Sequence, residues 1–315
     1  MIDPPLIVIT GLTASGKTDL AVSLAELIDG EIICADSRTV YKGLDIGTAK
    51  PSKLARRNIP HFALDLVEPD ERFTLYDFQL YARTKINEIR ERGKVPILVG
   101  GSGLYVDSII YSYKLRADNF KLSQRRELEA LTINDLLLKI KSAGIKLPKD
   151  IKNKRRLIRA IERNDKANNI EAFKLIDNTL VWGISVPRDQ LRKRIELRAQ
   201  LMVSQGIVEE ARSLIKRYGA VEPLKRNAYG AALKLINSEI SEDQLIKKIA
   251  QLDWRLARKQ ATWWRNSKRC KHIYWQTNDD FYKKIIQLKK LSPKNRRLEL
   301  AKWLSEYKNN TNLDS

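Results

Sequence analysis

The stretch Leu6–Thr18, LIVITGLTASGKT, places a glycine-rich loop directly after an apolar segment. Its part GLTASGKT, residues 11–18, fits the Walker A pattern between an expected strand at Leu6–Thr10 and an expected helix at Thr18–Ile28. Glycines let such a loop curl until successive backbone N–H groups point into one cavity, and the helix N-terminus adds partial positive charge. The stretch therefore predicts an α/β fold that binds phosphate, without indicating the reaction.

Strands and helices alternate over the first hundred residues. Apolar runs predict strands at Glu31–Ala35, Pro60–Val67 and Val95–Val99, and helical spacing of apolar residues predicts a helix at Leu75–Arg92. Leu180–Ile184 is expected to return to the same sheet. This alternation favours a parallel sheet whose ligand lies at the C-terminal ends of the strands.

Beyond Tyr105 the pattern changes to charged, amphipathic helices, expected at Leu122–Leu131, Ile133–Ala143 and Asn153–Arg163. We predict a P-loop NTPase-like α/β core formed by residues 1–115 and 179–315. Its C-terminal region is expected to be helical. Residues 116–178 are expected to form a helical insertion.

The charge of the chain is unevenly distributed. Residues 1–100 carry 13 basic and 14 acidic residues, whereas the remaining 215 carry 46 and 24, a net charge of +22. An excess of this size suits a polyphosphate partner such as a nucleic acid. A solvated, solubilising surface is the alternative explanation.

Other gross features indicate a cytoplasmic protein. The N-terminus, MIDPPLIVIT, lacks the basic segment of a secretory signal, and no apolar run reaches membrane-spanning length. Two cysteines, Cys34 and Cys270, are too few for a disulfide framework. We expect no membrane partner, and we expect the protein to act as a monomer.

Asp36 ends the second expected strand, at the start of DSRTVYKGLDIGTAKP. A carboxylate at this place can cap a helix, bind a metal or accept a proton from a nucleophile. Further motifs follow along the chain in a fixed order: PHFALDLVEPDERFTLYDF, VPILVGGSGLY, RRLIRAIE and RLARKQATWWR. With GLTASGKT, they resemble the tRNA dimethylallyltransferases over about Leu6 to Arg265.

The resemblance implies the reaction and its site. The phosphate loop would bind dimethylallyl diphosphate, and the prenyl group would pass to the exocyclic amine, N6, of the adenosine 3′-adjacent to the anticodon. Asp36 would be the general base, with Lys17 and Ser102 also catalytic, and Thr18 would hold Mg²⁺. The implied diphosphate cradle is Gly11, Thr13, Ala14, Ser15, Gly16, Lys17 and Thr18.

The resemblance also implies contacts with the tRNA anticodon stem-loop. The implied contacts are Asp36, Ser37, Arg38, Thr39, Ser102, Arg125, Arg155, Arg156 and Arg159. Arg155, Arg159 and Arg163 recur every fourth residue opposite an apolar helix face. A solvated helix face is the alternative for these arginines. An adenosine stacked in a loop must in any case be flipped out to reach a phosphate pocket.

Several positions leave their roles open or depart from the family pattern. Arg188, Arg194 and Arg198 suit contact with diphosphate or tRNA, and equally suit plain surface charge. Near the C-terminal helices we expect Leu252, Leu256 and Trp263 to face a core, with Arg255, Arg258, Lys259 and Arg265 facing RNA phosphates. The departures are Thr39 for glutamine, Phe62 for a second histidine, and AYGAA at Ala228–Ala232 for GYKE.

Two other functions compete with prenyl transfer. A small-molecule (nucleoside or nucleotide) kinase would hold ATP in the loop and use a Walker B carboxylate, for which Asp65 after FALDLV is the candidate. A non-catalytic RNA-binding ATPase would also explain the charge. The kinase leaves the +22 beyond residue 100 unexplained, and the ATPase leaves the compact Asp36 motif without a purpose.

Overall fold

The computed structural model describes residues 3–111, 113–115, 122–163 and 174–311. The chain divides into two compact units, one formed by Met1–Ser112 with Phe173–Ser315 and the other by Tyr113–Ala172. The second unit interrupts the first in sequence, close to the expected insertion at 116–178. The first unit contains the phosphate loop.

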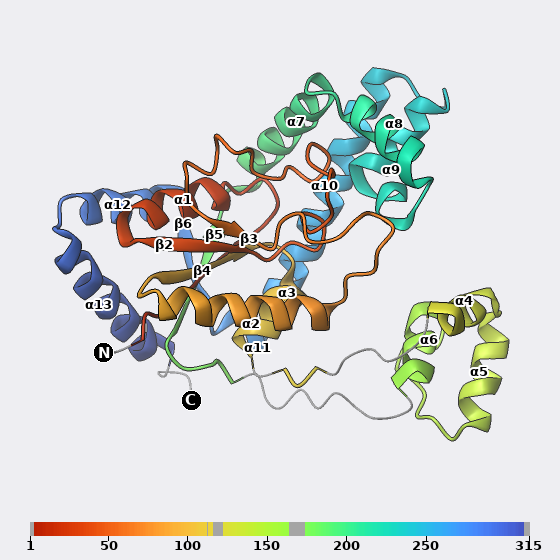
Figure 1. Cartoon of the computed structure of the whole chain (residues 1–315), viewed down its shortest axis with the longest axis horizontal. Coiled ribbons are helices and arrows are strands. Elements are labelled where there is room, and N and C mark those ends of the chain that lie inside the picture. Colours follow the sequence, from red (N-terminus) through yellow and green to blue (C-terminus); the bar gives the residue numbers. More distant parts are fainter. Residues whose placement is uncertain (1–2, 112, 116–121, 164–173, 312–315) are drawn as a thin grey trace. The chain divides into compact units, whose positions relative to one another are not determined.

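The first unit is built on a parallel sheet that has six strands within the described residues, in the order β3-β2-β4-β1-β5-β6 (Figure 1). The strands are β1 (Leu6–Gly11), β2 (Gly30–Cys34), β3 (His61–Phe62), β4 (Val95–Gly100), β5 (Thr179–Ser185) and β6 (Tyr274–Thr277). Every residue of β1, β2 and β4 is buried. A sheet covered on both faces requires such continuous apolar strands, so the predicted α/β class is confirmed.

Helices cover both faces of this sheet. Figure 1 shows α1 (Lys17–Ile28) and α2 (Leu75–Glu91) on opposite faces. On the side of α1, α12 (Asn278–Lys289) and α13 (Pro293–Thr311) each place an aromatic ring edge-on against Trp182 of β5. The other helices of this unit are α3 (Gly103–Ile110), α7 (Arg188–Ser204), α8 (Ile207–Tyr218), η1 (Glu222–Lys225), α9 (Asn227–Ile236), α10 (Glu242–Trp264) and α11 (Ser267–Cys270).

The strand order brings three functional segments to one edge of the sheet. β4 lies between β1 and β2, and all three run in the same direction. The phosphate loop follows β1, Asp36 follows β2, and Ser102 follows β4. Residues far apart in the sequence therefore meet where the carboxyl ends of these strands lie together.

Two expectations about strands were wrong. The expected strand Pro60–Val67 is a strand only at His61–Phe62, because Ala63 and Asp65 adopt left-handed backbone conformations with φ of 61° and 53°. The C-terminal region, expected to be all helical, contributes β6 to the sheet. β6 is a four-residue edge strand with one buried residue, too short for a pattern of alternation to reveal it.

Helices α7 to α10 form a second layer beside the sheet with a core of their own. Leu44, from the segment that follows Asp36, joins residues of α7, α8, α9 and α10 in this core. The helix α10 begins at a capping box in which the Ser241 hydroxyl accepts the N–H of Gln244. This layer therefore holds part of the loop after β2 against the helices.

The second unit contains three described helices, α4 (Leu122–Ala130), α5 (Ile133–Ser142) and α6 (Lys154–Arg163). Its core consists of the buried side chains Leu128, Leu136, Ile140, Ile145, Leu157, Ile158 and Ile161. Across the described parts of both units, no helix has the length and apolar character that crossing a membrane requires.

Candidate active site

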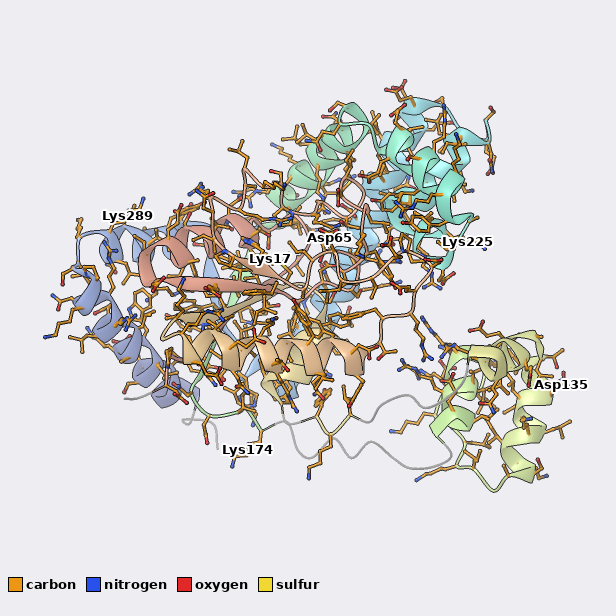
Figure 2. All side chains as sticks on the ribbon, viewed as in Figure 1. Lys17, Asp65, Asp135, Lys174, Lys225 and Lys289 are labelled. Carbon is orange, nitrogen blue, oxygen red and sulfur yellow. The ribbon has the colours of Figure 1, made fainter. Side chains whose placement is uncertain are left out.

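The phosphate loop closes tightly at the start of α1. Gly16 is the N-cap residue with φ of 82°, and a Cβ there would lie 2.9 Å from Nδ2 of Asn278, so the position requires glycine. Lys17 begins the helix (Figure 2). Its ammonium donates to the Leu12 carbonyl at 3.1 Å. Within the described chain no side chain caps α1, so its first N–H groups are available to an anion.

Two arginines of α7 contact this loop directly. Arg198 donates to the Thr13 hydroxyl at 2.8 Å, and Arg194 donates to the Ser15 carbonyl at 3.2 Å. Asn278 of α12 also donates to Ser15, at 3.0 Å. The two arginines lie on one face because they are four residues apart in a helix. Both arginines therefore contact the phosphate loop, and Arg198 also lines the cavity described below.

The helix α10 contributes two polar side chains that the sequence reasoning missed. Asp253 and Gln260 lie on the buried face of α10, each with 9% of its surface exposed. Gln260 accepts the Thr13 N–H at 2.7 Å and donates to the Gly101 carbonyl at 3.0 Å, while an oxygen of Asp253 lies 3.5 Å from Nε of Arg198.

The expected core face of α10 was wrong by one residue. Leu256 is exposed, Leu252 and Trp263 are half-buried, and Ala257 and Trp264 are buried. The buried face therefore includes the polar residues Asp253 and Gln260, so apolar spacing alone does not indicate it. A polar residue at helical spacing on an otherwise buried face was the available signal. The basic residues expected on the opposite face, Arg255, Arg258, Lys259 and Arg265, are exposed.

Asp36 lies half-buried at the end of β2. One of its carboxylate oxygens accepts the N–H of Arg38 at 2.8 Å, which fixes the turn in which the following residues lie. The Ser102 hydroxyl accepts the N–H of Ser37 at 3.2 Å, so the loops after β2 and β4 are joined. Ser102 also precedes α3 as its N-cap residue.

These segments surround a cavity of about 130 Å³. Polar residues of the phosphate loop, the Asp36 segment, α7 and α10 line it. They are Thr13, Lys17, Thr18, Asp36, Arg38, Thr39, Arg198, Asp253 and Gln260. Gly47, Thr48, Ala49 and Pro51 form a further wall. Ser37 and Ser102 are not among the described residues that line it. Half of the expected diphosphate and base contacts therefore converge on one space. Of the expected diphosphate cradle, Gly11, Ala14, Ser15 and Gly16 are not among the described lining residues.

The charged groups of the cavity perturb one another. Burial lowers the pKa of Lys17 to about 8, and Asp36 and Asp253 oppose this shift while Arg198 adds to it. Burial also raises the pKa of Asp253, partly offset by Arg198. Both shifts reflect charges removed from water, and a bound diphosphate would stabilise the charged form of Lys17.

A carboxylate on α8 holds the wall formed by residues 45–51. Glu210 accepts the backbone N–H groups of Asp45, Ile46 and Gly47 at 3.0–3.3 Å and the Tyr229 hydroxyl at 2.5 Å. A Cβ at Gly47 would lie 2.6 Å from the Tyr229 ring, so this tyrosine packs on the loop backbone. The departure AYGAA thus retains the side chain that supports the loop.

The basic residues expected to bind tRNA in the second unit differ in their surroundings. Arg125 is largely buried and pairs with Glu162 at 2.7 Å and Glu129 at 3.0 Å, so it stabilises the helices α4 and α6. Arg155, Arg156 and Arg159 are exposed on α6, and Arg156 lies 3.7 Å from Asp150. The side chain of Arg163 lies outside the described part of the structure.

Other candidates from the sequence do not reach the cavity as functional groups. Asp65, the carboxylate that a kinase would need, lies in a turn away from the cavity lining and pairs with Lys50 at 2.5 Å (Figure 2). Phe62 lies beneath the ammonium of Lys85. Cys34 does line the cavity, but burial raises the pKa of its thiol to about 12, which leaves it unreactive.

Comparisons with known proteins agree with this geometry. A family model described as IPP transferase matches residues 39–267. The tRNA dimethylallyltransferase of Staphylococcus haemolyticus is 36% identical over 84% of this chain and 84% of its own length, and that of Streptococcus equi is 38% identical over 83% and 88%. The crystal structure of a tRNA isopentenylpyrophosphate transferase from Bacillus halodurans covers 97% of this chain and 98% of its own, with 32% identity and a TM-score of 0.69. This chain belongs to the IPP transferase family.

Proposed function

We propose that this protein is a tRNA dimethylallyltransferase. It transfers the dimethylallyl group of dimethylallyl diphosphate to N6 of the adenosine 3′-adjacent to the anticodon, and it releases diphosphate. The observation that carries the proposal is a single cavity lined by Lys17, Arg198 and Asp36. The cavity thus offers cationic side chains for a pyrophosphate leaving group and a carboxylate that can accept a proton.

The cationic end of the cavity suits the diphosphate. Thr13 is already engaged through both its N–H and its hydroxyl, so it shapes the loop. The uncapped N–H groups at the start of α1, together with Lys17 and Arg198, are left to bind the diphosphate oxygens. As the C–O bond breaks, these donors stabilise the negative charge that the diphosphate gains.

Asp36 is suited to act on the adenosine that accepts the prenyl group. The N6 lone pair attacks the allylic C1, the C1–O bond breaks with its electrons passing to diphosphate, and the Asp36 carboxylate takes a proton from N6. The Arg38 N–H holds one oxygen of Asp36 and thereby orients the carboxylate. The reaction is balanced, because the proton lost by the amine ends on Asp36 and then in solvent.

Mg²⁺ fits the donor atoms of this cavity. Thr18 supplies a hydroxyl oxygen to the lining, and the described residues contain no cluster of three acidic, histidine or cysteine side chains that would form a complete protein site. Mg²⁺ commonly keeps water and binds substrate phosphates with one or two protein oxygens. When bound, it would neutralise diphosphate charge, and Thr18 is the residue that would hold it.

The tRNA is proposed to bind through its anticodon stem-loop. Flipping the adenosine out of its stack costs a few kcal/mol, which contacts elsewhere on the RNA must offset. Arg38 and Thr39 line the cavity where the base would enter, with Ser37 and Ser102 beside them. Exposed Arg155, Arg156 and Arg159 supply backbone contacts from the second unit, and we expect the protein to act as a cytoplasmic monomer.

Mass spectrometry of the reaction products tests the proposal. Unmodified tRNA, dimethylallyl diphosphate and Mg²⁺ are incubated with the protein, and the RNA is digested to nucleosides. We expect one added five-carbon unit on adenosine, and loss of that product when Mg²⁺ is chelated. A parallel incubation with ATP measures hydrolysis and phosphoryl transfer. Turnover of ATP without prenylated adenosine would favour a kinase or an ATPase instead.

A further inference from the structure

Gln260 is a buried amide with partners in two different loops. Its oxygen accepts the N–H of Thr13 in the phosphate loop at 2.7 Å, and its nitrogen donates to the carbonyl of Gly101, just before Ser102, at 3.0 Å. A Cβ at Gly101 would lie 2.5 Å from that nitrogen, so the amide packs directly on the loop backbone. One side chain of α10 therefore joins the loops that follow β1 and β4.

The chemistry of the two partners requires an amide. Thr13 presents a donor and Gly101 presents an acceptor, so the bridging group must accept at one atom and donate at the other. Glutamate at its usual charge accepts only, and leucine does neither. The bridge is therefore specific for glutamine or for a group that mimics it.

The bridge continues to Asp36. Ser102, adjacent to Gly101, accepts the N–H of Ser37, which follows Asp36 in the chain. The phosphate loop, Gln260, the loop after β4 and the Asp36 segment thus form one continuous series of contacts. Transfer requires the diphosphate-bound carbon and the N6 nitrogen to lie about 3–3.5 Å apart and in line, and a misplacement of about 1 Å can cost 10²-fold in rate.

We propose that Gln260 is a positioning residue that sets the spacing between the diphosphate-binding loop and the Asp36 segment. This inference rests on the proposed function, because it assigns those two parts to the two substrates. Gln260 acts through the loops it joins. Its loss is expected to leave each substrate able to bind alone and to slow the step that requires both.

The test compares Gln260→Leu with wild type in single-turnover prenylation. We expect the rate to fall at least tenfold, while the dissociation constants of inorganic diphosphate and of unmodified tRNA change less than about threefold. Trp303→Leu is the control, because Trp303 packs against Trp182 and Lys284 and is not among the described residues that line the cavity. It should lower the melting temperature and leave the single-turnover rate near that of wild type.

The pH dependence of the Gln260→Glu rate distinguishes the proposed hydrogen-bonding role from a purely structural one. A protonated glutamate has one donor and one acceptor, as glutamine has, whereas the ionised form has no donor for Gly101. We expect the rate of Gln260→Glu relative to wild type to increase as pH is lowered from about 8 to about 5.5, whereas the Gln260→Leu ratio stays flat. Lys17, Asp36, Arg198 and Asp253 also face this space, and Gln260→Leu, which adds no ionisable group, controls for their titration.

The outcomes separate this inference from the proposed function. If wild type does not prenylate tRNA, the function fails and the positioning role fails with it. If wild type is active and Gln260→Leu stays within about threefold of its rate, only the positioning role is overturned. If Gln260→Leu does not fold, a pH-independent Gln260→Glu ratio overturns the role in the same way.

Discussion

Asp36 and Asp253 show how position gives two carboxylates different properties. Both line the same cavity, but Asp36 is half-buried and oriented by the Arg38 N–H, whereas Asp253 is buried beside Arg198. Their charges interact, since Asp36 contributes to raising the pKa of Asp253. This difference supports the proposal that Asp36 accepts the proton, whereas Asp253 pairs with Arg198.

Replacing Asp36 by alanine should slow the chemical step. We expect the single-turnover rate to fall by about 10²-fold or more, the usual scale for a lost general base, with tRNA affinity unchanged. Asp36→Asn is the matched variant, because it keeps an acceptor for the Arg38 N–H and loses the basic oxygen. The two variants should be similarly slow. A near-normal rate in either would remove Asp36 from the role of base.

Asp253→Asn should change how stability depends on pH. Burial raises the pKa of Asp253 in the folded protein above its ordinary value, so its contribution to stability is complete below that ordinary value and is lost as pH rises through the raised one. Asparagine does not ionise. The free energy of unfolding of Asp253→Asn relative to wild type should therefore increase between about pH 4 and pH 7, measured by urea denaturation. Exposed Asp70→Asn is the control, and a constant or falling difference for Asp253→Asn would contradict the assignment.

Between elements, short contacts fix the loops of the site to distant helices. Glu210 of α8 binds three successive N–H groups at residues 45–47, and Arg194 and Arg198 of α7 bind the phosphate loop. Loops with few apolar side chains cannot be held by burial alone. Charged and polar contacts from the helical layer therefore determine their conformation.

Glu210→Ala should destabilise the protein and loosen the cavity wall. It leaves the N–H groups of residues 45–47 and the Tyr229 hydroxyl without this acceptor, and hydrogen bonds to charged groups contribute about 1.5–3 kcal/mol. We expect a loss of about 2 kcal/mol in urea denaturation and a higher KM for dimethylallyl diphosphate. Its exposed neighbour Glu209 is the control, for which Glu209→Ala should stay within about 0.5 kcal/mol of wild type. Equal effects of the two substitutions would show that the loop does not depend on Glu210.

Over the entire chain, the excess of basic residues lies outside the segment that carries the phosphate loop. The first hundred residues are nearly neutral, and the net +22 lies beyond them. The second unit exposes three arginines on α6 while its fourth expected contact, Arg125, is paired with glutamates. Exposed basic side chains release counterions when they bind phosphates, so their contribution depends on salt.

Arg159→Ala should weaken tRNA binding and flatten its salt dependence. Loss of one phosphate contact lowers the slope of log K against log salt by about 1. Lys139 is exposed on α5 of the same unit, and Lys139→Ala is the control, which should change neither the tRNA affinity nor the salt slope. Filter binding at several salt concentrations measures both. An unchanged slope for Arg159→Ala would show that this arginine belongs to a solvated helix face and does not contact an RNA phosphate.

Much of the fold could be predicted because its signals are local. Apolar runs revealed β1, β2, β4 and β5, and GLTASGKT revealed the phosphate loop with its helix. The expectation for Pro60–Val67 failed at Ala63 and Asp65, whose left-handed backbone no propensity indicates. β6 was missed because an edge strand of four residues is stabilised by its pairing with β5 rather than by its own composition.

The residues of the candidate site divide in the same way. Lys17 and Thr18 were candidates from the loop motif and Asp36 from its place at a strand end, because such features are formed by neighbouring residues. The role of Asp36 as the base came from the family resemblance. Arg198, Asp253 and Gln260 acquired their roles only when α7 and α10 packed beside the phosphate loop, up to 247 positions away in sequence. A polar side chain on a buried helix face has no local signature of its partner. Long-range packing selects that partner, and it alone made the two loops and the helix into one cavity.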